Sequence, residues 1–480
     1  MDSKSQEWCL RIEAVNLDHA VFDTHDISTI RGGSFMLLEV VNKLSEKIST
    51  LIPEVTGASV GLFSFTCNDL QEKDNLIIAV EKELKKQTGK FATFVYACLP
   101  LSDKDEFAET EQLLMAKCRW QQYRTLSFAL PESPATDECE MNGVRPADAK
   151  ISRSDGDVAV SVAVKKRFEE GRELRDKLYR ELLGELEMKT QFTRDIESLA
   201  GITKSGATEG KIALIHLDGN KFGKIRAESC RTLKDLKDFN NFIQKEIQEP
   251  SLKRLLTVAT KQQNTGFRTK SDEVRIETLM WGGDEIEWIV PASQLMNTLQ
   301  IFFEVASSKI FKGTPLTYSA GVVVCSHTVP ILQIRRYAEQ LCGIAKNDSK
   351  DAPSNQFTLL NMASFDAIHR DIGTFLDTYY RPATVKDFIV PYSEMQTLLS
   401  NVRTIRKNFP KNKLYEILAT LQAEKTTDEI IERVLKMISK PLKEPTKQAI
   451  EATTASNVNK WFLISDIWSL VDDTDHEPTI

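Results

Sequence analysis

The sequence predicts an α+β protein in which two βαββαβ domains precede a helical C-terminal domain. An almost continuous apolar run at residues 211–217 is typical of a strand that is buried on both faces. Strand-like runs at residues 274–281 and 286–290 flank a Gly-Gly-Asp-Glu segment, which is the composition of a hairpin turn. From about Thr374 onward helical periodicity replaces the strand patterns. We therefore expect sheet-based domains first and helices after them.

Each of the two strand segments ends in carboxylates. Asp218 directly follows the run at 211–217, while Asp284 and Glu285 project from the turn. Carboxylate oxygens are the ligands that Mg²⁺ prefers, and two such strand tips can share a pair of ions that stabilises both the attacking and the leaving oxygen of a displacement. Gly282 and Gly283 would let a phosphate approach the backbone and supply positive φ. The alternative is an ordinary hairpin turn without function.

The motifs around these carboxylates occur in a specific order. Asp-Gly-Asn-Lys-Phe-Gly at 218–223 and Gly-Gly-Asp-Glu at 282–285 precede Ser-Ala-Gly-Val at 319–322 and a helical segment that ends in Ala-Lys at 345–346. This order resembles the second palm domain of the large polymerase/cyclase subunit of type III CRISPR effector complexes. It is more distantly similar to GGDEF diguanylate cyclases. The CRISPR family is the closer match, since Phe-Gly-Lys at 222–224 comes after the first aspartate and His-Thr-Val-Pro at 327–330 follows the Ser-Ala-Gly strand.

The resemblance implies functional residues by position. It assigns metal binding to Asp218, the Gly219 carbonyl and Asp284, and catalysis to the two aspartates with Glu285, using two Mg²⁺ or Mn²⁺ ions per active site. Lys346 would contact triphosphate oxygens, although a lysine at a helix end is often simply a solvated charge. The nucleotide-binding residues implied in this way are Gly219, Asn220, Phe222, Gly223, Gly282, Gly283 and Lys346.

The N-terminal segment is similar to the first palm of the same family. Strand patterns at 8–17, 57–65 and 91–98 and a helix that opens near Arg31 suggest a ferredoxin-like βαββαβ unit without Gly-Gly-Asp-Glu, hence a degenerate palm. Ser34, with the amides of Gly32 and Gly33 at the helix start, would hold a phosphate. A plain helix cap is the alternative. The two palms would then form an intramolecular pseudo-dimer.

The expected domains are 1–130 (first palm), 131–209 (linker and charged helical connection), 210–373 (second palm) and 374–480 (helical domain). The family commonly carries a four-cysteine zinc finger near the linker, but only Cys118 and Cys139 lie there and no CxxC is present, so no structural zinc is expected. The interleaved charges from Ser161 to Lys189 favour a solvated helix face over a nucleic-acid patch.

The helical tail resembles a family domain that docks partner subunits, and buttressing the palm or dimerising are the alternatives. Its expected helices span residues 392–408, 413–423, 427–438 and 449–471, and an acidic end at 472–478 is expected to fray.

Composition limits the class of protein further. The 480 residues include 62 basic and 69 acidic side chains, a net charge of −7, which argues against nonspecific coating of nucleic acid. Eight scattered cysteines, no signal peptide and no apolar stretch of about twenty residues predict a cytoplasmic protein without a membrane segment. The Gly-rich segment at 206–211 lacks the Ser or Thr of a P-loop and precedes a strand, so it is not one. The His-Asp pair at 25–26 lacks the companion residues of an HD nuclease.

These observations lead to a functional hypothesis. We expect a nucleotidyltransferase that condenses NTPs, with ATP as the first choice, into a cyclic di- or oligonucleotide in prokaryotic antiviral defence and releases pyrophosphate. One alternative is a non-catalytic nucleotide-binding scaffold subunit of a CRISPR-type ribonucleoprotein, and another is a templated polymerase. Other CRISPR-type subunits or RNA are possible partners. The two intact aspartates argue against the scaffold, and the modest basicity argues against the polymerase.

Overall fold

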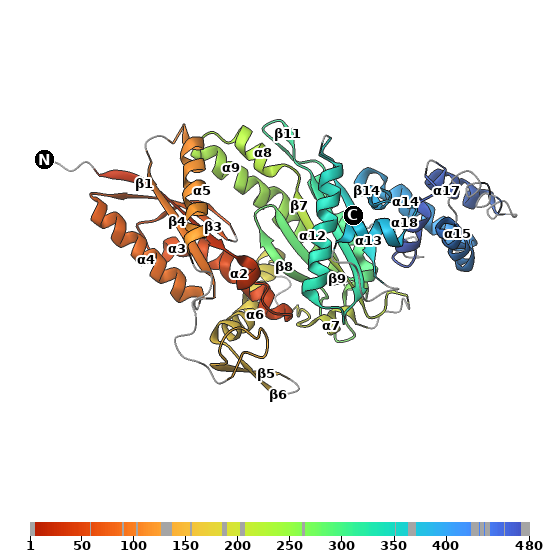
Figure 1. The fold of residues 1–480 in the computed structure, drawn as a ribbon, viewed down its shortest axis with the longest axis horizontal. Helices are drawn as coiled ribbons and strands as arrows, with labels where there is room; N and C mark the ends of the chain where they lie inside the picture. The colour runs from red at the N-terminus through yellow and green to blue at the C-terminus, as the bar shows by residue number, and fades with distance from the viewer. Residues whose placement is uncertain are drawn as a thin grey trace.

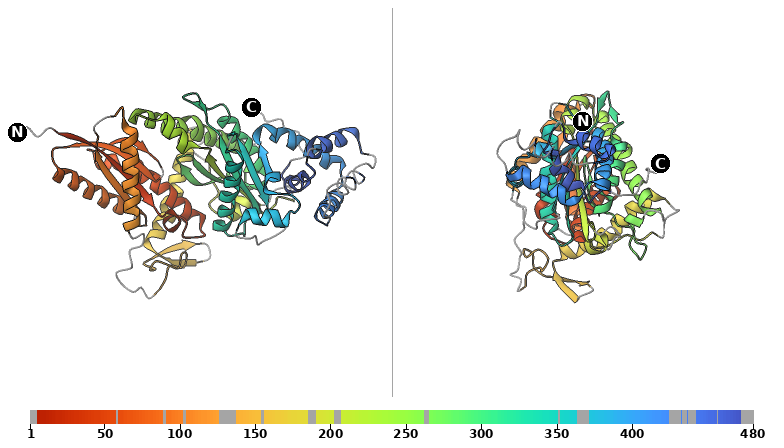
Figure 2. Two further views of the ribbon diagram at one scale, coloured as in Figure 1. Left: turned by 45° about the horizontal axis from the view of Figure 1, so that its top comes forward. Right: turned by 90° about the vertical axis from the view of Figure 1, so that its right-hand side faces the viewer.

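The computed structural model has a mixed α+β architecture, which confirms the expected class (Figure 1). A four-stranded sheet lies at one end, a six-stranded sheet in the middle, and a group of helices at the other end (Figure 2). The structure describes residues 5–57, 59–88, 91–101, 104–125, 137–153, 156–184, 190–201, 207–261, 265–350, 352–362, 371–423, 432, 436, 442–455 and 457–471.

The N-terminal domain is an antiparallel sheet in the order β2-β3-β1-β4. Strand β1 lies between β3 and β4, and most of its residues are buried. Trp8, Leu10 and Ile12 pack with the side chains of helix α4, and Cys9 faces the cluster that contains helix α5. In chain order its main elements are β1 (Gln6–Val15), α2 (Ile27–Asn42), β2 (Ile52–Thr56), β3 (Val60–Cys67), α4 (Leu70–Thr88), β4 (Thr93–Pro100) and α5 (Phe107–Arg124). Ala58, within the expected hairpin segment, lies outside the described residues.

The central domain repeats this pattern and extends it. Strands β8, β9, β7 and β12 lie in the same relative order as the four N-terminal strands, and β13 and β14 are added beyond β12. The apolar run predicted as a doubly buried strand is β7, whose residues 212–217 are all buried. Its elements are β7 (Lys211–Gly219), α8 (Phe222–Ser229), α9 (Leu233–Phe242), α10 (Glu249–Thr260), β8 (Glu277–Gly282), β9 (Glu285–Pro291), α11 (Leu295–Ala306), β12 (Tyr318–Ser326), α12 (Ile331–Asp348), β13 (Gln356–Asn361) and β14 (Ile389–Pro391).

Helix α6 (Val162–Leu183) joins the two domains by packing against α2 of the N-terminal domain and against α10 of the central domain. At their crossing a Cβ on Gly32 would lie 1.8 Å from the Arg167 carbonyl oxygen, and one on Gly171 would lie 2.4 Å from the Gly32 Cα. The glycines therefore permit a close helix crossing. The expectation that a helix starts at these glycines is wrong, because Asp26 caps α2 by accepting a hydrogen bond from the Thr29 amide. The amides of Gly32 and Gly33 lie inside the helix and are not available to a phosphate.

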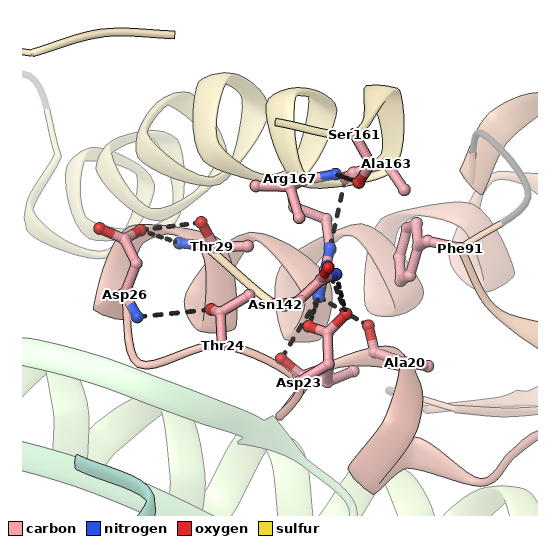
Figure 3. A network of polar contacts seen from close by, with 12 residues as sticks. Ala20, Asp23, Thr24, Asp26, Thr29, Phe91, Asn142, Ser161, Ala163 and Arg167 are labelled. Carbon is pink, nitrogen blue, oxygen red and sulfur yellow. Dashed lines mark hydrogen bonds and ion pairs between the residues drawn. The ribbon is translucent and has the colours of Figure 1, made fainter. Parts of the chain in front are cut away.

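Not all of the charge on α6 lies on the expected solvated face, because Arg167 and Arg175 are buried. Arg167 is fully buried and donates hydrogen bonds to the Ala20 carbonyl at 2.7 Å and to both carboxylate oxygens of Asp23 at 2.8 and 3.1 Å (Figure 3). Asn142 donates to the same carboxylate at 2.9 Å. This network fixes the loop after β1 to α6. Some of the charged residues of α6 therefore make buried contacts that hold this helix against the N-terminal domain.

The two cysteines near the expected linker lie in different clusters. Cys118 is buried on α5, and Cys139 is buried with Ile151, Val160 and Phe168 beneath the small hairpin of β5 (Ala149–Arg153) and β6 (Gly156–Val160). Residues 126–136 of that segment lie outside the described residues.

The C-terminal part is helical apart from β14, which pairs with β13 and so joins residues beyond Thr374 to the central sheet. The expected segment 449–471 contains two helices instead of one continuous helix, while residues 472–478 and most of 427–438 lie outside the described residues. The domain boundaries themselves stay predictions. No helix among the described residues combines the length and the apolar character needed to cross a bilayer. The helices are α13 (Ile372–Tyr379), α14 (Tyr392–Asn408), α15 (Lys411–Ala423), α17 (Glu444–Thr454) and α18 (Lys460–Ile467).

Candidate active site

Strand pairing brings the predicted carboxylates to one end of the central sheet. Leu217 of β7 pairs with Ile286 of β9, so Asp218 lies near the end of its strand, next to the turn that carries Asp284 and to Glu285 at the start of β9. Burial, followed by the negative charge of Asp218, raises the pKa of Asp284 from its ordinary 3.8 to about 6. Partial desolvation and the same charge also raise the pKa of Glu285. The structure thus creates mutual repulsion among these carboxylates, which a bound cation would relieve.

Helix α12 brings a cation to the first carboxylate. The Lys346 ammonium lies 2.5 Å from the Asp218 Oδ2 atom and is about two-thirds buried. The helix reaches this position because β12 has a glycine beneath it. A Cβ on Gly321 would lie 1.9 Å from the Ala338 carbonyl oxygen and 2.3 Å from the Cys342 amide nitrogen. Lys346 is therefore part of the site and not merely a solvated charge at a helix end.

Two residues that follow Asp218 shape the strand end through packing. A Cβ on Gly219 would lie 2.6 Å from the ring of Phe222. Phe222 is buried and meets the Tyr318 ring edge-on, with centroids 5.1 Å apart. Gly223, in contrast, is exposed in the first turn of α8. Among the expected nucleotide-binding residues, Phe222 thus stabilises the strand end from the core.

Asn220 is fixed from three sides. Its amide donates hydrogen bonds to the Thr317 Oγ1 atom and the Ser354 carbonyl, each at 3.0 Å, and its carbonyl accepts one from Ser319 at 2.8 Å. The side chain is buried. Both amide protons are therefore engaged within the protein, and Asn220 ties the end of β7 to β12.

The turn between β8 and β9 has the conformation that its glycines suggest. Gly283 adopts φ +62°, a value that favours glycine, and it is exposed. Its carbonyl accepts a hydrogen bond from the Gln248 side chain at 2.7 Å. Gln248 lies where the preceding helix segment meets α10, so the helices before β8 support the turn from behind.

A cavity of about 300 Å³ separates the turn from the N-terminal domain. Gly282, Gly283, Asp284 and Glu285 line one side, and Ser34 of α2 contributes to the other. The rest of the lining is largely apolar, as in sites that bind small molecules. The two halves expected to face each other therefore share one cavity, although Ser34 lies within its helix and not at a helix start.

A buried charge network behind Asp218 escaped the sequence analysis. The Nδ1 atom of His216 lies 2.9 Å from Glu287, which also pairs with Arg335 at 2.9 Å. Burial lowers the pKa of His216, but the hydrogen bond to Glu287 and its charge outweigh burial, so the pKa is raised overall. Arg335 also lies 3.6 Å from the ring centroid of Phe22 in the N-terminal domain. The only sequence signal was the i, i+2 spacing of His216 and Asp218 on one face of β7.

A second buried charge cluster connects the hairpin to the N-terminal domain. Glu277, at the start of β8, pairs with Arg31 of α2 and with Arg175 of α6 at 2.9 Å. All three side chains are fully buried, so each charge depends on the others for compensation. This cluster holds the strand that leads to Asp284 against both helices.

The donor set at the sheet end fits a hard divalent cation. Asp218, Asp284 and Glu285 supply carboxylate oxygens, and the pKa of Asp284 is raised by burial and by its carboxylate neighbour. Lys346 offsets only part of this negative charge. Oxygen-only ligands with excess negative charge are typical of Mg²⁺ and Mn²⁺ sites.

Three solved structures with a similar fold each contain Csm1. An apo Csm1-Csm4 cassette matches with a TM-score of 0.53 at 11% identity, over 97% of this chain and 70% of that chain. The chain has a Csm1-like fold. Csm1 from T.onnurineus matches with a TM-score of 0.52 at 11% identity, over 98% of this chain and 71% of that chain. A Csm1-Csm4 cassette in complex with pppApApA matches with a TM-score of 0.50 at 12% identity, over 97% and 70%.

The resemblance expected from the motifs is therefore confirmed at the level of the fold. No protein-family model matches the chain, and no curated protein matches it either. The shared Csm1-like fold thus rests on the three-dimensional arrangement of the elements.

Proposed function

We propose that this protein is a nucleotidyltransferase that joins NTPs, ATP first among them, into a cyclic di- or oligonucleotide and releases pyrophosphate. The observation that carries the proposal is the closeness of Asp218 to Asp284, which lines a cavity whose opposite side belongs to the N-terminal domain. One nucleotide would lie at the carboxylates, and a second would lie across the cavity near Ser34 and offer its hydroxyl.

The side chains at the sheet end are sufficient for this reaction, because it needs metal binding, orientation of the substrates and charge stabilisation from the protein. Asp218, the Gly219 carbonyl and Asp284 would hold two Mg²⁺ or Mn²⁺ ions, with Glu285 beside them. When bound, these ions supply charge stabilisation for the attacking hydroxyl and the leaving pyrophosphate. Once Asp218 binds metal, Lys346 would leave this carboxylate and contact triphosphate oxygens instead. The protein's own part is to orient both substrates and to stabilise developing charge.

Adenine nucleotides are our first choice of substrate because a Csm1-Csm4 cassette of similar fold has been solved with pppApApA. By the same comparison we propose that a Csm4-like subunit is a partner. The C-terminal helices are a candidate docking element for such a subunit. On this basis we propose that the protein acts in CRISPR-linked antiviral defence.

Product analysis tests the proposal directly. Full-length protein is incubated with each labelled NTP and Mg²⁺ or Mn²⁺, and products are identified by mass spectrometry. We expect cyclic products from ATP, and their loss in Asp218→Ala and Asp284→Ala because each removes a metal ligand without opening the core. Asp238→Ala, an exposed residue on α9, is the matched control. Wild-type product levels in both site variants would contradict the assigned site.

The same experiment separates the two alternatives. A scaffold subunit would bind labelled ATP without forming any product. A templated polymerase would form linear products only when a nucleic-acid template is added. Cyclic product without template supports the proposed reaction alone.

A further inference from the structure

A cluster of three different metal-binding side chains lies beside the proposed magnesium site. A ring nitrogen of His216, a carboxylate oxygen of Asp218 and the sulfur of Cys342 all lie within 4.8 Å of one another. They come from two elements, since β7 carries the first two at i, i+2 and α12 carries the third. The close approach of α12 over Gly321 sets their separation.

The second contact of His216 is typical of metal-binding histidines. Its Nδ1 atom faces the Glu287 carboxylate at 2.9 Å. A carboxylate accepts a hydrogen bond there, so Nδ1 carries the proton and Nε2 is the nitrogen available to a metal. Metal-binding histidines commonly donate their other ring nitrogen to a carboxylate, which fixes the ring and strengthens the ligand. Arg335 in turn holds Glu287 at 2.9 Å, so the arrangement is buttressed.

The chemistry of the donors selects the class of metal. Nitrogen, sulfur and oxygen ligands together favour Zn²⁺ and similar transition-metal ions over Mg²⁺, which prefers oxygen alone. With metal–ligand bonds of about 2.0 to 2.3 Å, tetrahedral ligands lie roughly 3.3 to 3.8 Å apart. Because the donor atoms lie within 4.8 Å of one another, they have to approach by no more than about 1.5 Å to bind one ion. Lys346 must release Asp218, and the Cys342 proton leaves to solvent as the sulfur binds.

We propose that His216, Asp218 and Cys342 form a transition-metal site of the Zn²⁺ class that competes with the magnesium site for Asp218. Occupancy by Zn²⁺ removes Asp218 from the Mg²⁺ ligands. Zn²⁺ then acts as an inhibitor of synthesis, and this consequence rests on the proposed function. Binding of the metal does not depend on that function.

Cobalt provides the direct test, because a Co²⁺–thiolate bond gives a near-ultraviolet charge-transfer band. Metal-free full-length protein is titrated with Co²⁺ and then with Zn²⁺. We expect the band to grow to one equivalent, to disappear on Zn²⁺ addition, and to be absent in Cys342→Ser. The control is Cys325→Ser, which changes another buried cysteine on β12 and should retain the band. No band in the wild type, or an unchanged band in Cys342→Ser, overturns the proposal.

A second variant covers the case in which Cys342→Ser does not fold. Asp218→Asn changes a partly exposed side chain and should keep the thiolate band, while the affinity for Co²⁺ falls at least about tenfold. Unchanged affinity in this variant overturns the assignment of Asp218.

Activity provides a separate readout of the inhibitory role. With Mg²⁺ and ATP present, the Zn²⁺ concentration that halves synthesis should rise at least about tenfold in Cys342→Ser. An equal Zn²⁺ sensitivity in wild type and variant overturns the inhibitory role. If the protein forms no product at all, the proposed function fails, and the cobalt titration still decides the metal site.

Discussion

Replacing Asp284 with asparagine is expected to stabilise the fold while it abolishes synthesis. Burial and the charge of Asp218 raise the pKa of Asp284 from 3.8 to about 6. At about 1.4 kcal/mol per unit the ionised carboxylate destabilises the folded state by about 3 kcal/mol. Because the side chain is only partly buried, solvent screening reduces this to about 1 to 3 kcal/mol at pH 7.5. Asp284→Asn removes that repulsion.

The sign of the effect sets its pH dependence. The folded pKa lies above the unfolded pKa, so the wild type loses stability as pH rises from 3.8 to 6. The increase in the free energy of unfolding caused by Asp284→Asn should thus be full above pH 6, shrink as pH falls below 6, and vanish below about pH 3.8.

The assay is urea denaturation of full-length wild type and Asp284→Asn in Mg²⁺-free buffer across this pH range. Asp238→Asn, on an exposed face of α9, is the control and should change the free energy of unfolding by less than about 0.5 kcal/mol. Mg²⁺ at 100 times its dissociation constant should then stabilise the wild type by about 2.7 kcal/mol and the variant much less. An unchanged or lower stability of Asp284→Asn at pH 7.5 would refute the repulsion.

Three further predictions test the framework around the site. Glu277→Gln should lower the free energy of unfolding by about 3 to 5 kcal/mol, because Arg31 and Arg175 stay buried without a counter-charge; Glu81→Gln, in an exposed pair, should cost less than about 1 kcal/mol in the same denaturation assay. Gly321→Ala should lower the stability by about 1 to 3 kcal/mol and reduce synthesis, since its Cβ forces α12 away from the sheet, and unchanged melting would contradict this. The rate of synthesis per molecule should stay constant on dilution, because both halves of the cavity belong to one chain, whereas a rate that falls steeply would indicate an obligate dimer.

Local patterns in the sequence were sufficient for the elements and for the carboxylates of the candidate site. The apolar run before Asp218 and the glycines before Asp284 are signals within a few residues, because a doubly buried strand must be apolar throughout and a tight turn needs glycine. Because both carboxylates were predicted at strand ends, Asp218 was expected to lie near the turn that carries Asp284. The fold class could therefore be predicted without any long-range contact.

Contacts between distant segments required the tertiary structure. The sequence around Gly32 predicts the beginning of a helix, yet Gly32 lies inside α2. The missing side chain lets α6 pack closely against α2, and no local sequence pattern reveals such a helix crossing. His216 meets Glu287 because the register of β7 and β9 places them opposite each other. A shift of one residue in this register would separate the two side chains. Cys342 reaches the same place only because Gly321 lets α12 approach the sheet. Sequence determines which segments are strands and helices, while the register and spacing between them decide which side chains meet.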